Sequence, residues 1–125
     1  MTAADIVSTY RLQMRGDAFT FADAVAVADY LGRLGISHLY LSPILTAADG
    51  SQHGYDVTDP TTVSAALGGF AGLQALADEV RSRGMGLVLD IVPNHMAASL
   101  ETPWWRSCIV SRGCGTSTRC APRRP

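Results

Sequence analysis

Short apolar segments alternate with amphipathic ones along the first two thirds of this sequence. Residues 6–12 (IVSTYRL) and 36–43 (ISHLYLSP) are rich in apolar and β-branched residues, and residues 87–92 (LVLDIV) are almost continuously apolar. A continuous apolar run is typical of a parallel strand that is covered on both faces. Two segments between these runs have the apolar spacing of helices, so the predicted order is β-α-β-α-β.

The first helix is predicted to begin after Thr20. This threonine can cap the helix, and Asp23 stands three residues later in the capping-box position. Gly35 stands where a left-handed residue commonly ends a helix. The apolar residues between these two signals recur at helical spacing, at Ala24, Val27, Leu31 and Leu34.

The second helix is predicted from Phe70 to Arg83, with Gly84 ending it. Its apolar face consists of Phe70, Leu73, Leu76 and Val80. A long polar loop, residues 46–62, is predicted between the second strand and this helix. Crossovers of this length join parallel strands with right-handed connections. They favour an open doubly wound sheet or part of a closed α/β barrel, and the lack of a G-x-G-x-x-G element after the first strand disfavours a nucleotide-binding sheet.

Polar and aromatic residues stand at the carboxyl ends of all three predicted strands. In an α/β barrel these ends meet at one rim, and that rim carries the chemistry. We therefore expect one polar cluster that draws on three strand ends. Its candidate members are Arg11 and Gln13 after the first strand, His53, Tyr55 and Asp56 after the second, and Asp90, Asn94 and His95 after the third.

The last 20 residues differ sharply in charge from the rest. Residues 106–125 hold 5 of the 10 basic residues and none of the 11 acidic ones, and they show no helical or strand period. We predict that residues 1–105 form part of an α/β domain and that residues 106–125 are an irregular tail, read from a shifted frame. The tail holds all 3 cysteines, whose spacing is not a C-x-x-C zinc pattern, at Cys108, Cys114 and Cys120.

Charge and hydropathy narrow the class of protein. The net charge of -1 argues against a general surface for nucleic acid or anionic membranes. No apolar run approaches the ~20 residues that span a bilayer. The N-terminus also lacks a basic start followed by an apolar run. We expect a soluble, cytoplasmic protein with no nucleic-acid or membrane partner.

Several segments together resemble a known family. Residues 90–95 (DIVPNH) resemble the D-x-x-x-N-H element that follows the third barrel strand in the α-amylase superfamily, glycoside hydrolase family 13. Residues 35–43 (GISHLYLSP) resemble its glycine-to-proline element at the second strand. The segments STYRLQMRGDAFTF, HLYLSPILTA and HGYDVTDPT narrow the resemblance to the malto-oligosyltrehalose synthases. The resemblance covers roughly residues 6–105.

This resemblance implies both a fold and an activity. The fold would be the N-terminal β-α-β-α-β portion of a (β/α)8 TIM barrel, incomplete in this chain. The activity would be that of an isomerase of trehalose biosynthesis. Such an enzyme converts the reducing-end α-1,4 bond of a maltodextrin into an α,α-1,1 bond by intramolecular glucosyl transfer. No cofactor and no metal ion is implied.

The resemblance also implies roles for four residues. Asp90 and His95 would shape the subsite beside the scissile bond, Asp90 by holding an arginine and His95 by binding a sugar hydroxyl. Tyr55 would stack on the sugar ring, and Asp56 would support the same shell. Glycoside chemistry of this kind needs two carboxyl groups, which in this family come from later strands. The resemblance therefore implies no catalytic residue in this chain and an inactive fragment.

Two alternatives remain open. The chain can belong to another α-amylase superfamily hydrolase or transglycosylase that acts on α-glucans. It can also be a truncated product with no function, or with a non-catalytic binding role. Taken singly, Tyr55 can cover a barrel mouth and Arg11 can be a structural partner of a nearby acid. Maltodextrin binding without turnover would separate a binding remnant from the enzymes.

Overall fold

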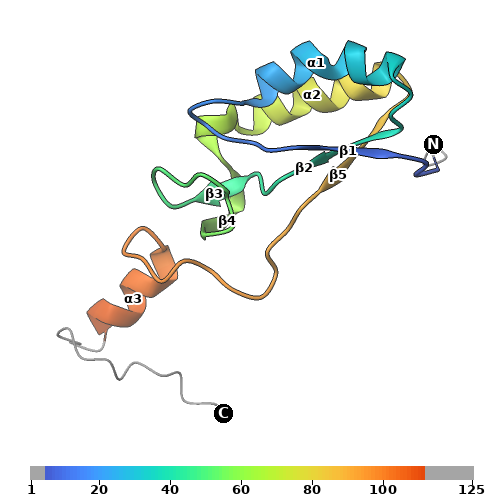
Figure 1. The fold of residues 1–125 in the computed structure, drawn as a ribbon. Coiled ribbons are helices and arrows are strands. Elements are labelled where there is room, and N and C mark those ends of the chain that lie inside the picture. Colours follow the sequence, from blue (N-terminus) through green and yellow to red (C-terminus); the bar gives the residue numbers. More distant parts are fainter. Residues whose placement is uncertain (1–4, 112–125) are drawn as a thin grey trace.

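The computed structural model describes residues 5–111, which form two sheets, two long helices and two shorter ones (Figure 1). The predicted β-α-β-α-β order is confirmed, with an additional hairpin between the second strand and the second helix. The elements are β1 (Thr9–Leu12), α1 (Phe21–Arg33), β2 (His38–Leu41), β3 (Leu45–Ala47), β4 (Val57–Val63), the 3-10 helix η1 (Ala65–Leu67), α2 (Gly69–Ser82), β5 (Gly86–Leu89) and α3 (Pro103–Ser111).

The main sheet has 3 parallel strands in the order β1-β2-β5. Its register aligns Thr9 with His38 and His38 with Gly86, so the strands begin level with one another. Helices α1 and α2 lie side by side over one face of the sheet (Figure 1). In the described part of the chain no helix covers the other face (Figure 1). A parallel sheet with helices on one side is the arrangement of consecutive units in a (β/α)8 barrel.

The core lies between this sheet and its two helices. Leu39 and Leu41 of β2 are fully buried there together with Phe21 and Leu76. Successive residues of a strand point to opposite faces, so Leu39 and Leu41 share the helix-covered face. On the predicted apolar face of α1, Ala24 and Leu31 are buried and Val27 packs against the core, but Leu34 lies beyond the helix and is 57% exposed.

The predicted ends of both long helices are confirmed. The Asp23 carboxylate accepts the Thr20 backbone N–H at 2.8 Å and the Thr20 side chain faces the Asp23 backbone N–H, which together form the capping box. The Thr20 hydroxyl also donates to Asp23 Oδ2 at 2.8 Å. The hydrogen bond from the Thr20 backbone, followed by that from its hydroxyl, lowers the pKa of Asp23. Gly35 and Gly84 follow α1 and α2 with φ of 89° and 72°, a left-handed conformation that glycine adopts without a steric penalty.

Residues 46–62 are not the single polar loop that the sequence predicts. Strands β3 and β4 occupy both ends of this segment and pair antiparallel, with Thr46 opposite Asp59. The β-branched residues of VTDPTTV favour an extended chain, and Val57 is buried. Asp59 and Pro60 therefore lie within β4 rather than in a turn, Asp59 half-buried and Pro60 exposed.

Strand β5 also differs from its prediction. A run such as LVLDIV was expected to be covered on both faces, but the residues of β5 are half-buried and Leu89 is 41% exposed. The cause is the uncovered face of the sheet, which leaves β5 with helices on one side only. β5 also ends at Leu89, so Ile91 and Val92 follow it outside the strand.

Helix α3 crosses residue 105, the predicted boundary between the domain and the tail. It runs from Pro103 to Ser111, so residues 106–111 are helical rather than irregular. Its first turn is anchored by Thr102, whose carbonyl accepts a hydrogen bond from Arg106 N at 3.0 Å. Cys108 lies in α3, whereas Cys114 and Cys120 lie outside the described residues. The proposed origin of the tail in a shifted reading frame stays a prediction.

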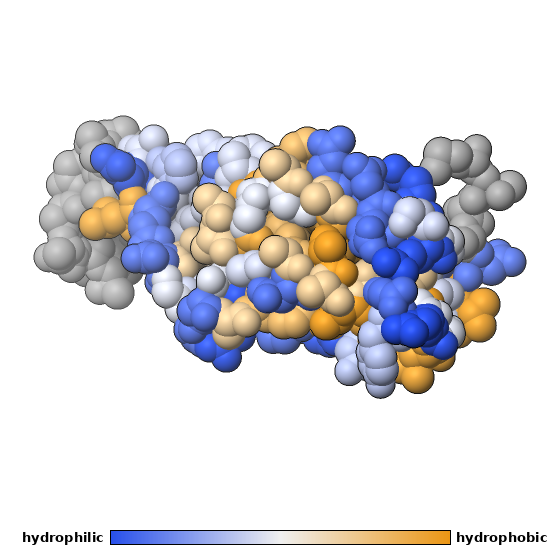
Figure 2. Space-filling view, turned by 90° about the horizontal axis from the view of Figure 1, so that it is seen from above, coloured by the Kyte–Doolittle hydropathy of each residue, from blue (hydrophilic) through white to orange (hydrophobic). Residues whose placement is uncertain are grey.

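The outer surface of the two long helices is divided between apolar and charged residues. Apolar residues gather over its middle, and hydrophilic residues gather at the end where both helices terminate (Figure 2). At that end Arg83 Nη1 lies 2.5 Å from Asp29 of α1 and Arg83 Nη2 lies 2.6 Å from Glu79 of α2. Among residues 5–111, no helix is long and apolar enough to cross a membrane.

Candidate functional site

Polar side chains lie on the uncovered face of the sheet. Arg11 is paired with Tyr40 in the register of β1 and β2, so both residues point to the face opposite Leu39 and Leu41. Asp90 follows the last residue of β5 and extends the ladder by one bond, from its N–H to Leu41 O at 3.0 Å. By the same alternation Asp90 lies on the face that carries Tyr40.

Four of these residues form a connected group, here called the Asp90 cluster: Arg11, Tyr40, Tyr55 and Asp90. Tyr55 donates its hydroxyl hydrogen to Asp90 Oδ2 at 2.6 Å, and Tyr40 donates to the same oxygen at 3.1 Å. Arg11 Nη1 lies 3.6 Å from that oxygen, and Arg11 Nη2 donates to the Tyr55 hydroxyl at 3.2 Å. The Arg11 guanidinium also lies 5.1 Å from the centre of the Tyr40 ring, within cation–π distance.

The electrostatics of the Asp90 cluster follow from these contacts. The hydrogen bond that Tyr40 donates to Asp90 raises the pKa of Tyr40, because ionising the phenol would place two anions together. The hydrogen bond to Tyr55 raises the pKa of Arg11. The Asp90 side chain is 19% exposed, so it is shielded by its partners yet still reachable from solvent.

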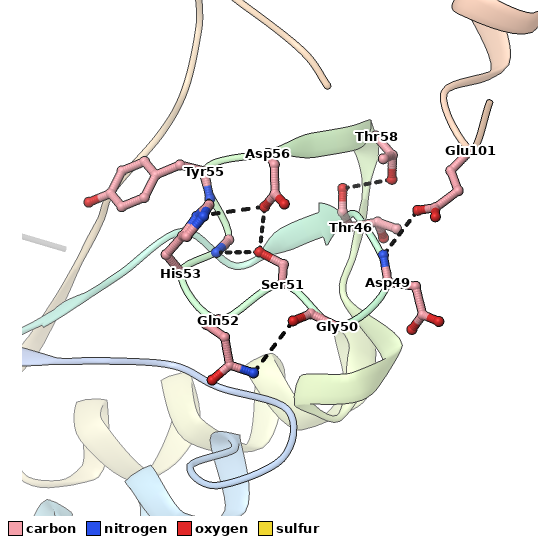
Figure 3. Close-up of polar contacts among 11 residues, drawn as sticks. Thr46, Asp49, Gly50, Ser51, Gln52, His53, Tyr55, Asp56, Thr58 and Glu101 are labelled. Carbon is pink, nitrogen blue, oxygen red and sulfur yellow. Dashed lines mark hydrogen bonds and ion pairs between the residues drawn. The ribbon is translucent and has the colours of Figure 1, made fainter. Parts of the chain in front are cut away.

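The loop between β3 and β4 delivers Tyr55 to the cluster. The Tyr55 ring points away from this loop (Figure 3). Gly54 sits beside Pro43 with φ 75°, and a Cβ there would lie 2.7 Å from Pro43 O. Only glycine permits this close approach, which holds the loop against the end of β2.

Asp56 and His53 stabilise the loop from within (Figure 3). Ser51 donates its hydroxyl hydrogen to Asp56 and accepts one from Gly54 N at 3.0 Å. His53 Nδ1 accepts the Tyr55 backbone N–H at 3.0 Å and lies 3.6 Å from Asp56 Oδ1. Asp56 directly follows Tyr55 in the sequence, but its carboxylate faces the loop and not the Asp90 cluster.

The structure brings together only part of the predicted set. Tyr55 and Asp90 meet, and Arg11 is the ion-pair partner of an acid, as predicted. His95 is exposed, and within residues 5–111 its hydrogen bonding is confined to Asn94 Oδ1 at 3.3 Å. Tyr40 was missed as a site residue. Its signal is the alternation in HLYL, which places a polar-tipped ring between two core leucines.

The polar loop between β3 and β4 borders a cavity that lies apart from the Asp90 cluster. A cavity of about 310 Å³ lies between the turn at residues 15–17 and the β3–β4 loop. Its lining includes Asp17, Asp49 and Gln52 but no member of the cluster. In the part of the chain that the structure describes, no group of three or more metal-binding side chains is present.

The chemistry of the Asp90 cluster suits a polyhydroxylated ligand. It combines two aromatic rings with a charge-assisted hydrogen-bond network, and one carboxylate oxygen accepts several donors. Few, precisely placed polar groups beside an aromatic surface are typical of sites that orient a small polar ring. These features define a candidate carbohydrate-binding surface at the carboxyl ends of the strands.

Comparison with known proteins identifies the class. The α-amylase catalytic domain matches residues 24–112 of this chain, so the chain belongs to the α-amylase family. Its β-α-β-α-β unit is therefore part of an α-amylase-type barrel, as the sequence predicts.

Similar relatives point to one branch of that family. Over 109 residues the chain is 60% identical to a putative maltooligosyl trehalose synthase of Mycobacterium tuberculosis. This match covers 82% of this chain and 14% of that protein. The structure of maltooligosyltrehalose synthase from Arthrobacter ramosus matches with a TM-score of 0.79 and 48% identity over 85% of this chain and 14% of that one. The α-amylase SusG of Bacteroides thetaiotaomicron is 43% identical over 83 residues, which are 66% of this chain and 11% of that protein. The chain spans about 14% of the length of the synthases that it matches.

Proposed function

We propose that this chain is the N-terminal barrel segment of a malto-oligosyltrehalose synthase and contributes part of its maltodextrin-binding surface. The whole enzyme would convert the reducing-end α-1,4 bond of a maltodextrin into an α,α-1,1 bond. The observation that carries this proposal is the 60% identity over 109 residues to a putative synthase. The Asp90 cluster supplies the physical support, because it presents aromatic rings and a carboxylate at the strand ends.

The proposed division of labour assigns binding to this segment and bond cleavage to other parts of the enzyme. Glycoside chemistry requires two carboxyl groups that flank the bond. Among the described residues, Asp90 is the single carboxylate in the cluster, and both tyrosines and Arg11 already occupy its Oδ2. The cluster therefore lacks the second carboxyl group that this chemistry requires, so we propose that the 125-residue chain binds maltodextrin without turnover.

The role proposed for Tyr55 is to contact a sugar ring, with Asp90 accepting a sugar hydroxyl. Asp56 is proposed to support this surface indirectly, because its carboxylate holds the loop that carries Tyr55. His95 is proposed to join the sugar site in the whole enzyme. Its exposed ring, whose described partner is only its neighbour, leaves it available for that contact.

The test is a titration of the 125-residue chain with maltopentaose, followed by the NMR signals of the Tyr40 and Tyr55 rings. We expect saturable shifts at both rings and no non-reducing product in a parallel assay. The Tyr55→Ala variant should lose the response of the Tyr40 ring, whereas Tyr30→Ala, which removes a tyrosine that is 63% exposed on the helix side, should retain it. Turnover by the purified chain would refute the division of labour, and unmoved signals would refute glucan binding.

A second candidate is a hydrolase or transglycosylase of the same family. It is favoured by the 43% identity over 83 residues to the α-amylase SusG. The higher identity to the synthase over a longer stretch, 60% over 109 residues, favours the synthase. A truncated product without function is the third possibility, and the titration described above distinguishes it.

A further inference from the structure

The segment between β5 and α3 is held by the sheet at one end and by the β3–β4 hairpin at the other. At the sheet, the Asp90 N–H makes the last hydrogen bond of the ladder. At the hairpin, the Ala97 N–H donates to Val57 O at 2.8 Å. In the described part of the chain, the hydrogen bonding of the residues between these anchors is confined to the contact of His95 with its neighbour. The position of His95 therefore depends on the anchor at Ala97, two residues later.

Residues 97–102 hold both sides of the loop between β3 and β4. On the β4 side, the hydrogen bond of Ala97 fixes the first residue of the strand. On the β3 side, Glu101 Oε2 accepts the Asp49 N–H at 3.0 Å, and Figure 3 shows the carboxylate reaching this backbone group. One short segment therefore joins the chain after β5 to the loop that carries Tyr55.

Thr102 fastens this segment to the start of α3. It is 3% exposed, and its hydroxyl donates to Ala97 O at 2.7 Å. Its backbone N–H donates to Ser99 O at 3.0 Å. Pro103 follows as the first residue of the helix, where a proline loses no helical hydrogen bond. Ala97 is thus held by both of its backbone groups, the N–H by β4 and the carbonyl by Thr102.

We propose that residues 97–102 form a clasp that fixes Tyr55 and His95 relative to each other. Glu101 and Thr102 are its positioning residues, because each acts through a backbone group that it holds. Loosening either grip should loosen both, since the two residues are adjacent in one short segment. This inference rests on the proposed function for the roles of Tyr55 and His95. A site that is ordered before its ligand arrives loses less conformational entropy on binding.

The first test measures amide hydrogen exchange in the 125-residue chain without a ligand. Glu101→Ala removes the acceptor of the Asp49 N–H and should speed exchange at Asp49 about 3- to 10-fold. A clasp that couples its two grips predicts faster exchange at Ala97 as well. Glu101→Gln keeps an acceptor oxygen and should restore much of the protection at both amides. Glu79→Ala, which removes a glutamate paired with Arg83 on the helix layer, should leave both amides unchanged.

The second test starts from the other grip. Thr102→Val replaces the hydroxyl by a methyl group of similar size. It should speed exchange at Ala97 and, through the clasp, at Asp49. Thr102→Ser keeps the hydroxyl and should retain the protection. Thr9→Val, at an exposed threonine of β1, is the matched control. If Glu101→Ala affects only Asp49 and Thr102→Val affects only Ala97, the coupling is absent and the clasp is overturned.

A third measurement separates positioning from general stability. Backbone amide relaxation in NMR should show more motion at Tyr55 and His95 in both Glu101→Ala and Thr102→Val, while exchange at Leu39 in the core stays unchanged. Unchanged relaxation at Tyr55 and His95, or an equal rise in exchange at Leu39, would overturn the positioning role. No ligand enters these measurements. A failure of maltopentaose to bind would therefore overturn the proposed function, while exchange and relaxation still decide whether the clasp exists.

Discussion

The two faces of the three-stranded sheet use the same strands for opposite purposes. On the face beneath α1 and α2, Leu39 and Leu41 are fully buried. On the other face, Tyr40 lies between them in sequence and belongs to a hydrogen-bonded cluster with Arg11 and Asp90. The comparison teaches that one face stabilises the fold by burying apolar side chains. The other face carries hydrogen-bonding side chains without reducing that apolar burial.

Alternation along the strand makes this separation possible. Because successive side chains point to opposite faces, a polar residue can stand between two core residues without entering the core. The polar face then depends on mutual hydrogen bonds for its order, as in the pair of tyrosines that share Asp90 Oδ2. Substitutions on the two faces should therefore have different signatures.

The largest effect is expected from the helix-covered face. Leu39→Ala should lower the free energy of unfolding by about 2–5 kcal/mol, because it removes buried methyl groups and leaves a cavity. Tyr40→Phe changes the next residue on the opposite face and should cost clearly less, since the ring is retained. Urea-induced unfolding of both variants checks this, and a larger loss for Tyr40→Phe would break the comparison between the faces.

An intermediate effect is expected where the open face is tightly packed. A Cβ on Gly86 would lie 2.4 Å from the ring of His38, its partner in the register. Gly86→Ala should therefore destabilise the chain by about 1–3 kcal/mol through overpacking. The His38→Ala substitution removes the ring that a Cβ on Gly86 would meet. It should therefore lower the free energy of unfolding much less in the Gly86→Ala variant than in the unsubstituted chain. Additive losses in thermal unfolding would argue against this contact.

A smaller effect is expected at the start of the helix layer. Thr20→Ala should lower the free energy of unfolding by about 1 kcal/mol, because the capping hydroxyl is lost. The control is Thr9→Ala on the open face, where Thr9 is exposed and the loss should be smaller.

The same cap should respond to pH. Asp23 has a pKa lowered by the Thr20 backbone N–H, so its contribution is fully present above its unfolded pKa of about 4 and is lost as pH falls through the lower folded value. The stability difference between the unsubstituted chain and Asp23→Asn should therefore shrink below about pH 4. A difference that is constant between pH 7 and pH 3 would contradict this role.

The subtlest prediction sharpens the description of the open face. Asp90→Asn should lower the pKa of Tyr40 towards its ordinary value, because the hydrogen-bonded carboxylate is the main reason that it is raised. NMR signals of the Tyr40 ring, followed as pH rises, measure this. Asp59→Asn is the matched control, since Asp59 accepts its hydrogen bonds from Thr61 and Thr62. An equal change in both variants would point to a general charge effect.

Several features could be predicted because their causes lie within a few residues. The capping pair Thr20–Asp23 and the left-handed Gly35 and Gly84 depend on local hydrogen bonds and local sterics. The apolar period of each helix is equally local, although Leu34 showed that a pattern can continue beyond the point where the helix ends. The meeting of Tyr55 and Asp90 followed from the general geometry of parallel strands, whose carboxyl ends share one rim.

Other features could not be predicted because they depend on which distant segments become neighbours. The β3–β4 hairpin requires pairing between Thr46 and Asp59 across a polar loop, and β-propensity alone is a weak guide there. The open face of β5 depends on where helices are placed, which an apolar run does not reveal. His95 was expected in the same cluster as Asp90 because both follow the third strand, yet β5 ends at Leu89 and the chain beyond Asp90 leaves the sheet.

By itself, the sequence of this protein determined the order of strands and helices, the ends of the helices and the membership of the α-amylase family. The elements and their ends depend on short-range periodicity and on capping residues, and the family membership depends on short motifs of neighbouring residues. Only the tertiary structure decided which contacts Arg11 and Tyr40 make with Asp90, because the three residues come from β1, β2 and the end of β5 and are brought together by the register of these strands. Register is set by packing across the whole sheet, so no local pattern contains it.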